Sequence, residues 1–347
     1  MERSGSDSTR EQESHPSSNE RFGQSGEQER GADTLPSVSN ISRFQASPPA
    51  NMVWIPGGSF LMGSNDFYPR VTVEGFWIDA HPVTNAQFRE FVDATGYVTV
   101  AERTPNPRNY PGIDPEQLVP GSLVFRRPSG PVDLRDYRAW WVYLPGAAWH
   151  CPEGPGSTIA GREHHPVVHV AYEDALAYAA WAGKALPTEA EWEFAARGGL
   201  EGATYVWGNE FAPGGRMMAN TWQGDFPWQN LKIDGYEGTS PVGAFPPNGY
   251  GLFDMAGNVW EWTIDTYAPH GHTASDPPCC VEQQQAGSPG QIHDDKTDAQ
   301  IECKVVKGGS HLCAPNYCLR YRPAARQGLA TDTSACHVGF RCVIRSK

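Results

Sequence analysis

The chain has 347 residues, and its 37 Gly, 30 Pro and 12 Trp with only 19% charged side chains indicate a loop-rich fold rather than a helical bundle. The formal net charge of −13 argues against a nucleic-acid partner, because phosphate binding needs clustered Lys and Arg. No run approaches the roughly 20 apolar residues that span a bilayer, and the N-terminus lacks the apolar core of a signal peptide, so we expect no membrane partner.

The N-terminal segment differs in composition from the rest of the chain. Residues 1–48 are rich in Ser, Glu, Gln and Gly and hold almost no large apolar side chains, which predicts a disordered tail. We expect one folded domain over residues 49–347. Its first elements are predicted to be a hairpin over Asn51–Gly63, which turns at a Pro-Gly-Gly sequence, and a strand over Val71–Ile78.

Three helices are predicted in the middle of the chain. Capping-box patterns begin at Thr84 and at Thr188, and Gly96 and Gly198 are the matching stop signals. An Ala-rich run over residues 172–182 predicts the third helix, between the other two. Together with the strands, these helices predict an α+β chain with low secondary-structure content on an irregular scaffold.

Two segments are predicted to be inserted loops. Residues 100–160 alternate Pro and Gly with aromatic side chains, and residues 265–302 are polar. The sequence alone does not decide the role of four of the eight cysteines, which are Cys279, Cys280, Cys303 and Cys336.

The C-terminal run Lys307–Arg322 contains the most informative pair of residues. Cys313 and Cys318 flank a short Pro-Asn turn. Paired thiolates are soft ligands that favour Cu(I) or Zn²⁺, and two thiols at this spacing can also form a disulfide. A four-cysteine zinc site with Cys336 and Cys342 is a further alternative, although zinc ribbons use tighter C-x2-C pairs. Spacing alone leaves metal, disulfide and structural roles open.

Two other segments place oxygen ligands at spacings that suit Ca²⁺. Asn220 and Asp234 lie in a segment with little predicted regular structure, and Asp254 and Glu261 flank a Gly turn. The alternative is that these residues form Asx turns at the surface. We call the two segments the first and the second oxygen cage.

Charged and aromatic residues adjoin the thiol pair. Arg320 and Arg322, with Tyr321 between them, suit an anchor for a peptide or a carboxylate, or else a strand whose residues are alternately buried and solvated. His311, beside Ser310, is either a ligand or proton carrier or a hydrogen-bonded structural group.

Seven motifs occur in the order found in one known family. The chain resembles the formylglycine-generating enzymes of the bacterial type, also called sulfatase-modifying factors, from about residue 51 to the C-terminus. The resemblance implies one catalytic domain with a variant of the C-type-lectin-like fold. The motifs that carry it are Met52–Phe60, Pro82–Asn85, His165–Val170, Leu186–Glu193, Asn248–Leu252, Gly257–Trp262 and Gly339–Cys342.

The resemblance also implies specific roles for residues. Cys313 and Cys318 lie in the segment Gly-Gly-Ser-x-x-Cys-x4-Cys-x-Arg-Tyr-Arg of active members, which implies that they bind Cu(I) and act in catalysis with Ser310. The implied substrate-binding residues are Trp260, Arg320, Tyr321 and Arg322. The implied structural Ca²⁺ ligands are Asn220, Asp234 and the carbonyls of Thr221 and Tyr236 in the first oxygen cage, and Asp254, Glu261 and the carbonyls of Gly257 and Val259 in the second.

The implied activity is an O2-dependent oxidation of a cysteine to Cα-formylglycine in an unfolded sulfatase polypeptide with the motif Cys-x-Pro-x-Arg. We expect the enzyme to be a monomer. Two alternatives are a non-catalytic family member that binds a partner, and a metal-free oxidase that cycles its two thiols through a disulfide.

The sequence departs from the family pattern near the expected site. Ala314 stands where the family often has His, Gly328–Asp332 replaces an Asn-Thr-Pro-Asp stretch, and Asp254 stands where Asn is more common. These changes put substrate preference in question. Members from the endoplasmic reticulum have extra disulfides whose matching positions here are Ala179, Ala196 and Pro323, which predicts a reducing cytoplasm.

Overall fold

The computed structural model describes residues 49–63, 70–268 and 301–346. The predicted disordered tail over residues 1–48 and the Cys279-Cys280 pair lie outside the described residues. Among those described, regular structure is confined to short strands, short helices and isolated 3-10 turns. The helices are α1 (Asn85–Thr95), α2 (Tyr172–Trp181) and α3 (Glu189–Arg197), and the 3-10 turns are Val100–Glu102, Pro107–Asn109, Pro115–Gln117, Tyr137–Ala139 and Pro213–Gly215.

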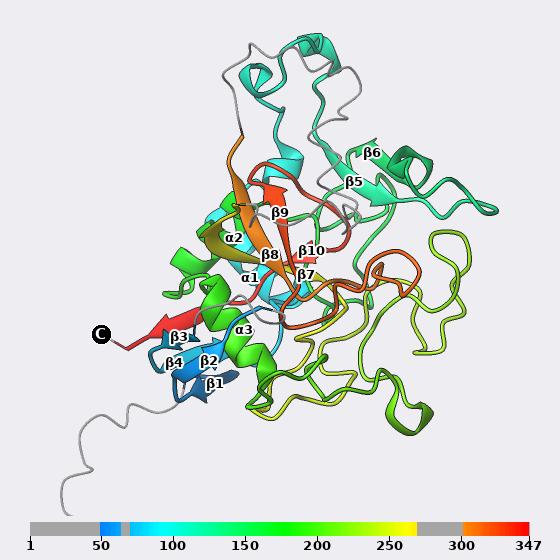
Figure 1. Ribbon diagram of the computed structural model, residues 1–347. Coiled ribbons are helices and arrows are strands. Elements are labelled where there is room, and N and C mark those ends of the chain that lie inside the picture. Colours follow the sequence, from blue (N-terminus) through cyan, green and yellow to red (C-terminus); the bar gives the residue numbers. More distant parts are fainter. Residues whose placement is uncertain (1–48, 64–69, 269–300, 347) are drawn as a thin grey trace, which may run out of the picture. The chain divides into compact units, whose positions relative to one another are not determined.

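The strands of the described chain form small sheets (Figure 1). One sheet has the order β1 (Met52–Ile55), β4 (Phe76–Asp79), β11 (Val343–Arg345), and another has the order β10 (Val338–Gly339), β7 (Trp260–Thr266), β8 (Cys303–Lys307), β9 (Arg326–Ala330). Two-stranded sheets join β2 (Gly58–Leu61) to β3 (Arg70–Val73) and β5 (Gly121–Phe125) to β6 (Trp141–Pro145). The α+β class with low secondary-structure content is confirmed.

The predicted helices are confirmed, and their caps explain their ends. At the start of α1, Gln87 N–H donates to Thr84 Oγ1 at 3.3 Å while Thr84 N–H donates to Gln87 Oε1 at 2.9 Å. The same reciprocal pair joins Thr188 and Glu191 before α3. Gly96 and Gly198 then end α1 and α3 with φ angles of 67° and 55°, which glycine adopts without strain.

The predicted N-terminal hairpin is wrong in its pairing. Strands β1 and β2 do not pair with each other; β1 pairs with β4 and β2 with β3, in one continuous antiparallel register. The Pro56-Gly57 sequence interrupts this ribbon rather than reversing it. Gly57 has a φ of 74°, and a Cβ there would lie 2.7 Å from Val73 O. The segment predicted as a single strand over Val71–Ile78 is likewise split into β3 and β4 at Gly75.

Two further predictions needed correction. The expected loop over residues 100–160 contains the β5–β6 hairpin as well as irregular structure. The strand that was an alternative for Arg320–Arg322 is absent from this described segment, because β9 begins only at Arg326.

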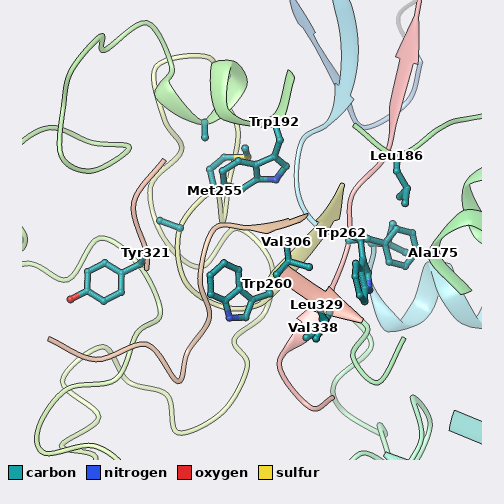
Figure 2. Close-up of a cluster of buried hydrophobic side chains, with 14 of the residues drawn as sticks. Ala175, Leu186, Trp192, Met255, Trp260, Trp262, Val306, Tyr321, Leu329 and Val338 are labelled. Carbon is teal, nitrogen blue, oxygen red and sulfur yellow. The ribbon is translucent and has the colours of Figure 1, made fainter. Parts of the chain in front are cut away.

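A buried aromatic core supports the four-stranded sheet. Helix α3 packs against β7 and β8, and its Trp192 is 0% exposed. Trp260 and Trp262, at 1% and 0% exposed, extend the core along β7, and Figure 2 shows them beside Val306 of β8. The loop that follows β8 therefore leaves from a rigid platform. No helix in the described ranges is long and apolar enough to span a membrane.

Candidate active site

The loop that carries the two thiols begins at a Gly pair directly after β8 (orange in Figure 1). Gly308 and Gly309 have φ angles of 92° and 69°, which other residues rarely adopt. A Cβ on Gly309 would lie 2.8 Å from the backbone of Arg320 and Tyr321, and one on Gly308 would lie 3.0 Å from the Trp192 ring. The Gly pair thus allows the two ends of the loop to meet above the core.

Cys313 and Cys318 are buried, with 1% and 6% of their surface exposed. Cys318 N–H donates to Ala314 O at 2.9 Å, which closes the turn between the thiols. Ser310 N–H donates to Cys313 Sγ at 3.4 Å, and an N–H donor directed at sulfur stabilises negative charge there. Ser310 therefore acts on the thiol through its backbone, while its hydroxyl accepts from Leu312 N–H at 3.2 Å.

His311 is a structural group in this arrangement. Its backbone N–H and its ring Nδ1 both lie within hydrogen-bond distance of Asn258 O, at 3.0 and 2.8 Å. Since a carbonyl only accepts, Nδ1 carries the proton. Burial lowers the pKa of His311 to about 4, so the ring is neutral near pH 7. These contacts fix the loop to the segment of the second oxygen cage.

The four predicted substrate-binding residues divide into two groups. Trp260 and Tyr321 are 1% and 0% exposed and belong to the buried cluster of Figure 2. Arg320 and Arg322 reach the surface in part, and Arg320 Nη1 donates to Gln327 Oε1 at 2.6 Å. Burial raises the pKa of Tyr321, and its hydroxyl has no hydrogen-bond partner among the described residues. That these four residues contact a substrate stays a prediction.

The donor set at the thiol turn fits a soft ion of low coordination number. Within the described ranges, no group of three or more His, Cys, Asp and Glu side chains is placed to hold a metal. Cys336 Sγ instead accepts from Phe125 N–H at 3.3 Å, and Cys342 N–H donates to an Asp79 oxygen at 2.9 Å. The four cysteines do not assemble into a zinc site, and a pair of thiolates remains suited to Cu(I).

The described chain also contains cysteines outside the thiol turn. Cys151, Cys336 and Cys342 are free cysteines. Burial raises the pKa of Cys336 to about 12 and that of Cys342 well above its ordinary value. Both therefore stay protonated and unreactive near pH 7. Cys303 starts β8 and is partly buried.

Hydrogen bonds to the Asp234 carboxylate gather part of the first oxygen cage. Asp234 accepts from Thr221 N–H at 3.1 Å, from Tyr236 N–H at 3.0 Å and from Gln223 Nε2 at 2.8 Å. The same Gln223 nitrogen also donates to Thr221 O. Asn220 Nδ2 donates to Gly238 O at 2.9 Å, which leaves the amide oxygen as its ligand atom. Carboxylate, amide and carbonyl oxygens are the ligand types that Ca²⁺ prefers, and Ca²⁺ stays a prediction here.

The carboxylate of the second oxygen cage already has a cationic partner. Glu261 Oε2 accepts from Trp192 Nε1 and from Arg341 Nε, each at 2.7 Å, and Oε1 accepts from Arg341 Nη2 at 2.8 Å. Both charged groups are 0% exposed. Asp254 accepts from Gly243 N–H at 2.8 Å and from Asn258 Nδ2 at 3.2 Å, and burial raises its pKa. This donor set fits Ca²⁺ less well, because Arg341 supplies the positive charge.

Backbone contacts join both oxygen cages to the thiol loop. A Cβ on Gly257 would lie 2.1 Å from Asn220 O, so only glycine fits at this crossing, and the Val259 side chain beyond it is buried. Gly257 N–H donates to Gly308 O at 2.9 Å, and Trp222 N–H donates to Cys313 O at 3.0 Å. The loop is therefore held from two sides.

The departures from the family pattern have defined positions. Gly328, Leu329 and Ala330 are buried in β9, and Asp332 accepts from the Tyr110 hydroxyl at 2.9 Å. Ala314 is 0% exposed inside the thiol turn. Their effect on substrate preference stays a prediction.

Sequence reasoning missed three residues that shape the site. Arg341 and Gln223 contact the predicted Ca²⁺ ligands, and Phe226 contacts the thiol turn. Arg341 and Phe226 lie 80 and 90 residues from their partners in the sequence. Gln223 lies nearer to Asp234, but no sequence motif links the two residues. The only available signal was that Arg341 belongs to one of the seven motifs.

The sequence of the chain is similar to those of known proteins. Residues 38–346 match the family model of the sulfatase-modifying factor enzyme 1-like domain. The chain is 57% identical over 301 residues to the formylglycine-generating enzyme of Mycobacterium tuberculosis, covering 84% of this chain and 97% of that protein. It is 48% identical to the enzyme of the same name from Thermomonospora curvata, with coverages of 84% and 92%.

More distant similarities include a protein described as inactive and a solved structure. The inactive C-alpha-formylglycine-generating enzyme 2 of Mus musculus is 40% identical, covering 89% of this chain and 90% of that protein. The structure of PvdO from Pseudomonas aeruginosa aligns with a TM-score of 0.52 at 24% identity, covering 84% of this chain and 93% of that one. At this identity the likeness concerns the fold alone.

Proposed function

The chain belongs to the family of sulfatase-modifying factor enzyme 1-like proteins, and we propose that it oxidises a cysteine of a sulfatase polypeptide to Cα-formylglycine. The observation that carries the proposal is the pair of buried thiols, Cys313 and Cys318, on a loop fixed to the core. A loop without contacts to the core would not hold two sulfurs at a constant separation. The similarity to enzymes named for this reaction supports the same conclusion.

The proposed reaction balances with O2 and an external thiol reductant. The substrate Cβ–S unit loses two electrons and two protons to give a thioaldehyde, and water then replaces its sulfur to leave the aldehyde and hydrogen sulfide. Reduction of O2 to water takes up four electrons, of which the reductant supplies the other two. The net change in the peptide is replacement of CH2–SH by CHO.

We assign Cu(I) to Cys313 and Cys318, because two thiolates suit a soft ion. When bound, the ion supplies the one-electron chemistry that O2 reduction requires. The protein groups have separate tasks. Ser310 N–H stabilises charge on Cys313 Sγ, and the burial of Cys313 and Cys318 keeps bulk water away from the sulfurs. Ca²⁺ in the first oxygen cage would stiffen the segment that contacts Cys313, and we keep the second cage as the weaker proposal.

The substrate is proposed to be an extended segment with the motif Cys-x-Pro-x-Arg. A cysteine inside a folded sulfatase could not reach a pair of buried thiols, so the polypeptide must be unfolded when it binds. Arg320 and Arg322 would contact its backbone or carboxylates, and Tyr321 would support them from the core. We expect a monomer in the reducing cytoplasm, which the free thiols of Cys151, Cys336 and Cys342 suit.

Three serine variants test the assignment of the thiols. We expect C313S and C318S each to lose tight Cu(I) binding and peptide oxidation, because one thiolate cannot supply two soft ligands. C336S is the matched control, since Cys336 is a partly buried thiol outside the turn, and it should retain both properties. Oxidation that persists in C318S would contradict the proposal. Peptide binding without oxidation, with Cu(I) bound, would indicate a non-catalytic member of the family.

A further inference from the structure

The turn between the two thiols is only partly fixed by its own hydrogen bonds. The N–H groups of Tyr317 and Cys318 both donate to Ala314 O, at 3.2 and 2.9 Å. Pro315 and Asn316, at the outside of the turn, are exposed. Two sulfurs that share one ion must keep a constant separation, so a turn whose outer half moves would hold the ion poorly.

A second segment contacts this turn from a distant part of the sequence. Trp222 N–H donates to Cys313 O at 3.0 Å, at the start of the turn. Phe226 N–H donates to Asn316 Oδ1 at 3.3 Å, across 90 residues of sequence. The Phe226 ring also stacks on Tyr317, with centroids 4.8 Å apart and an interplanar angle of 11°. These contacts reach the beginning, the tip and the end of the turn.

The contacting segment is itself rigid. Phe226 is 2% exposed, and Trp140 and Trp222 pack edge-to-face against it with centroid distances of 5.5 and 5.2 Å. Trp140 also packs edge-to-face on Tyr317 at 5.7 Å. Aromatic contacts of this kind each add about 0.5–1.5 kcal/mol beyond simple burial. The segment can therefore act as a fixed surface for the turn.

We propose that Phe226 and Asn316 are positioning residues that hold Cys313 and Cys318 at the separation needed for metal binding. The proposal deepens the function proposed above and rests on it. Neither residue touches the reacting atoms; they act through the backbone of the turn. Because Asn316 is exposed, its substitution should leave the core intact, whereas a substitution of Phe226 would also leave a cavity.

The experiment compares N316A, N316D and N230A with the wild-type chain. Asn230 is a matched control, because its Oδ1 likewise accepts a backbone N–H, from Lys232 at 3.0 Å, but does not contact the thiol turn. N316D keeps an acceptor oxygen. One readout is Cu(I) affinity, measured by competition with a chromophoric chelator. The other is the rate at which iodoacetamide alkylates Cys313 and Cys318 in the metal-free protein, since buried thiols react when the turn opens.

We expect N316A to bind Cu(I) about three- to tenfold more weakly and to be alkylated faster by a similar factor, as loss of one hydrogen bond predicts. N316D and N230A should resemble the wild type in both readouts. If N316A matches the wild type in both, the positioning role is wrong while the proposed function stands. If the wild type binds no Cu(I) but N316A is still alkylated faster, the proposed function fails and the support of the turn is upheld.

Discussion

The two oxygen cages have similar predicted ligand types but different electrostatics. Each is predicted to combine two side-chain ligands with two backbone carbonyls. Within the described residues, the hydrogen bonds to the Asp234 carboxylate of the first cage come from neutral N–H donors. The Glu261 carboxylate of the second is paired with the buried guanidinium of Arg341. The spacing of acidic residues therefore locates a carboxylate without identifying its counter-ion, and we expect the first cage to depend on Ca²⁺ more than the second.

The largest expected effect tests the counter-ion of the second cage. R341M leaves the buried Glu261 carboxylate unpaired, which should lower the free energy of unfolding by about 3–5 kcal/mol. R345M is the control, because Arg345 pairs with Glu191 in a similar geometry but is 39% exposed, and its loss should cost no more than about 1 kcal/mol. Urea unfolding measures both. Recovery of R341M by added Ca²⁺ would contradict the distinction between the cages.

Removal of Ca²⁺ should separate the cages directly. A chelator is expected to lower the melting temperature of the wild type, because a ligand at a hundred times its Kd adds about 2.7 kcal/mol of stability. D234N should abolish this response, since it removes the charged ligand of the first cage. E261Q should keep the response, although its baseline stability is lower. If the chelator leaves the melting temperature of the wild type unchanged, the assignment of Ca²⁺ to both cages is wrong.

The buried His169 lies outside both cages and should make the stability of the protein depend on pH. His169 donates to Pro152 O through Nε2 at 2.9 Å, lies 2.7 Å from Ser122 Oγ, and has its pKa lowered from 6.5 to about 4 by burial. As the pH falls, His169 of the unfolded chain therefore binds a proton at a higher pH than His169 of the folded chain. Stability is complete above the unfolded pKa and is lost as the pH falls from 6.5 towards 4.

At about pH 5 this histidine should cost the wild type about 2 kcal/mol of its free energy of unfolding. H169Q cannot titrate in this range, so its stability should fall less between pH 7 and pH 5. Urea unfolding in the presence of chelator measures the difference without a contribution from Ca²⁺. If the free energy of unfolding falls equally in the two proteins between pH 7 and pH 5, His169 does not cause the acid dependence.

The smallest expected effect concerns Asp254. Its carboxylate accepts from Gly243 N–H and from Asn258 Nδ2, and an amide can keep one of these two bonds. D254N should therefore cost about 1 kcal/mol or less and leave the response to chelator unchanged. A loss as large as that of R341M would show that the Asp254 charge has a role of its own.

Local signals predicted local structure well. The helices α1 and α3 follow from capping residues three positions apart, which contact each other whatever the rest of the chain does. The pairing of β1 with β4 could not be predicted in this way, because Pro56-Gly57 resembles a turn and interrupts a ribbon instead. Pairing depends on contacts between segments that no local pattern encodes.

The same limit applies to the candidate site. The thiol spacing identified Cys313 and Cys318, but their support by Phe226 spans 90 residues and has no sequence pattern. Arg341 is likewise 80 residues from Glu261. The buried positions of Trp260 and Tyr321 also differ from what a substrate-contact role suggests, because burial depends on the whole fold.

The central claim is that the protein oxidises a peptidyl cysteine, and mass spectrometry of one peptide tests it most directly. An unstructured peptide with Cys-x-Pro-x-Arg is incubated with Cu(I)-loaded protein, O2 and a thiol reductant, beside a copy in which Ser replaces the cysteine. We expect that the first peptide alone loses the mass expected when CHO replaces CH2–SH, and that it then reacts with hydrazides. A cysteine peptide that keeps its mass in the presence of fully loaded protein would contradict the account.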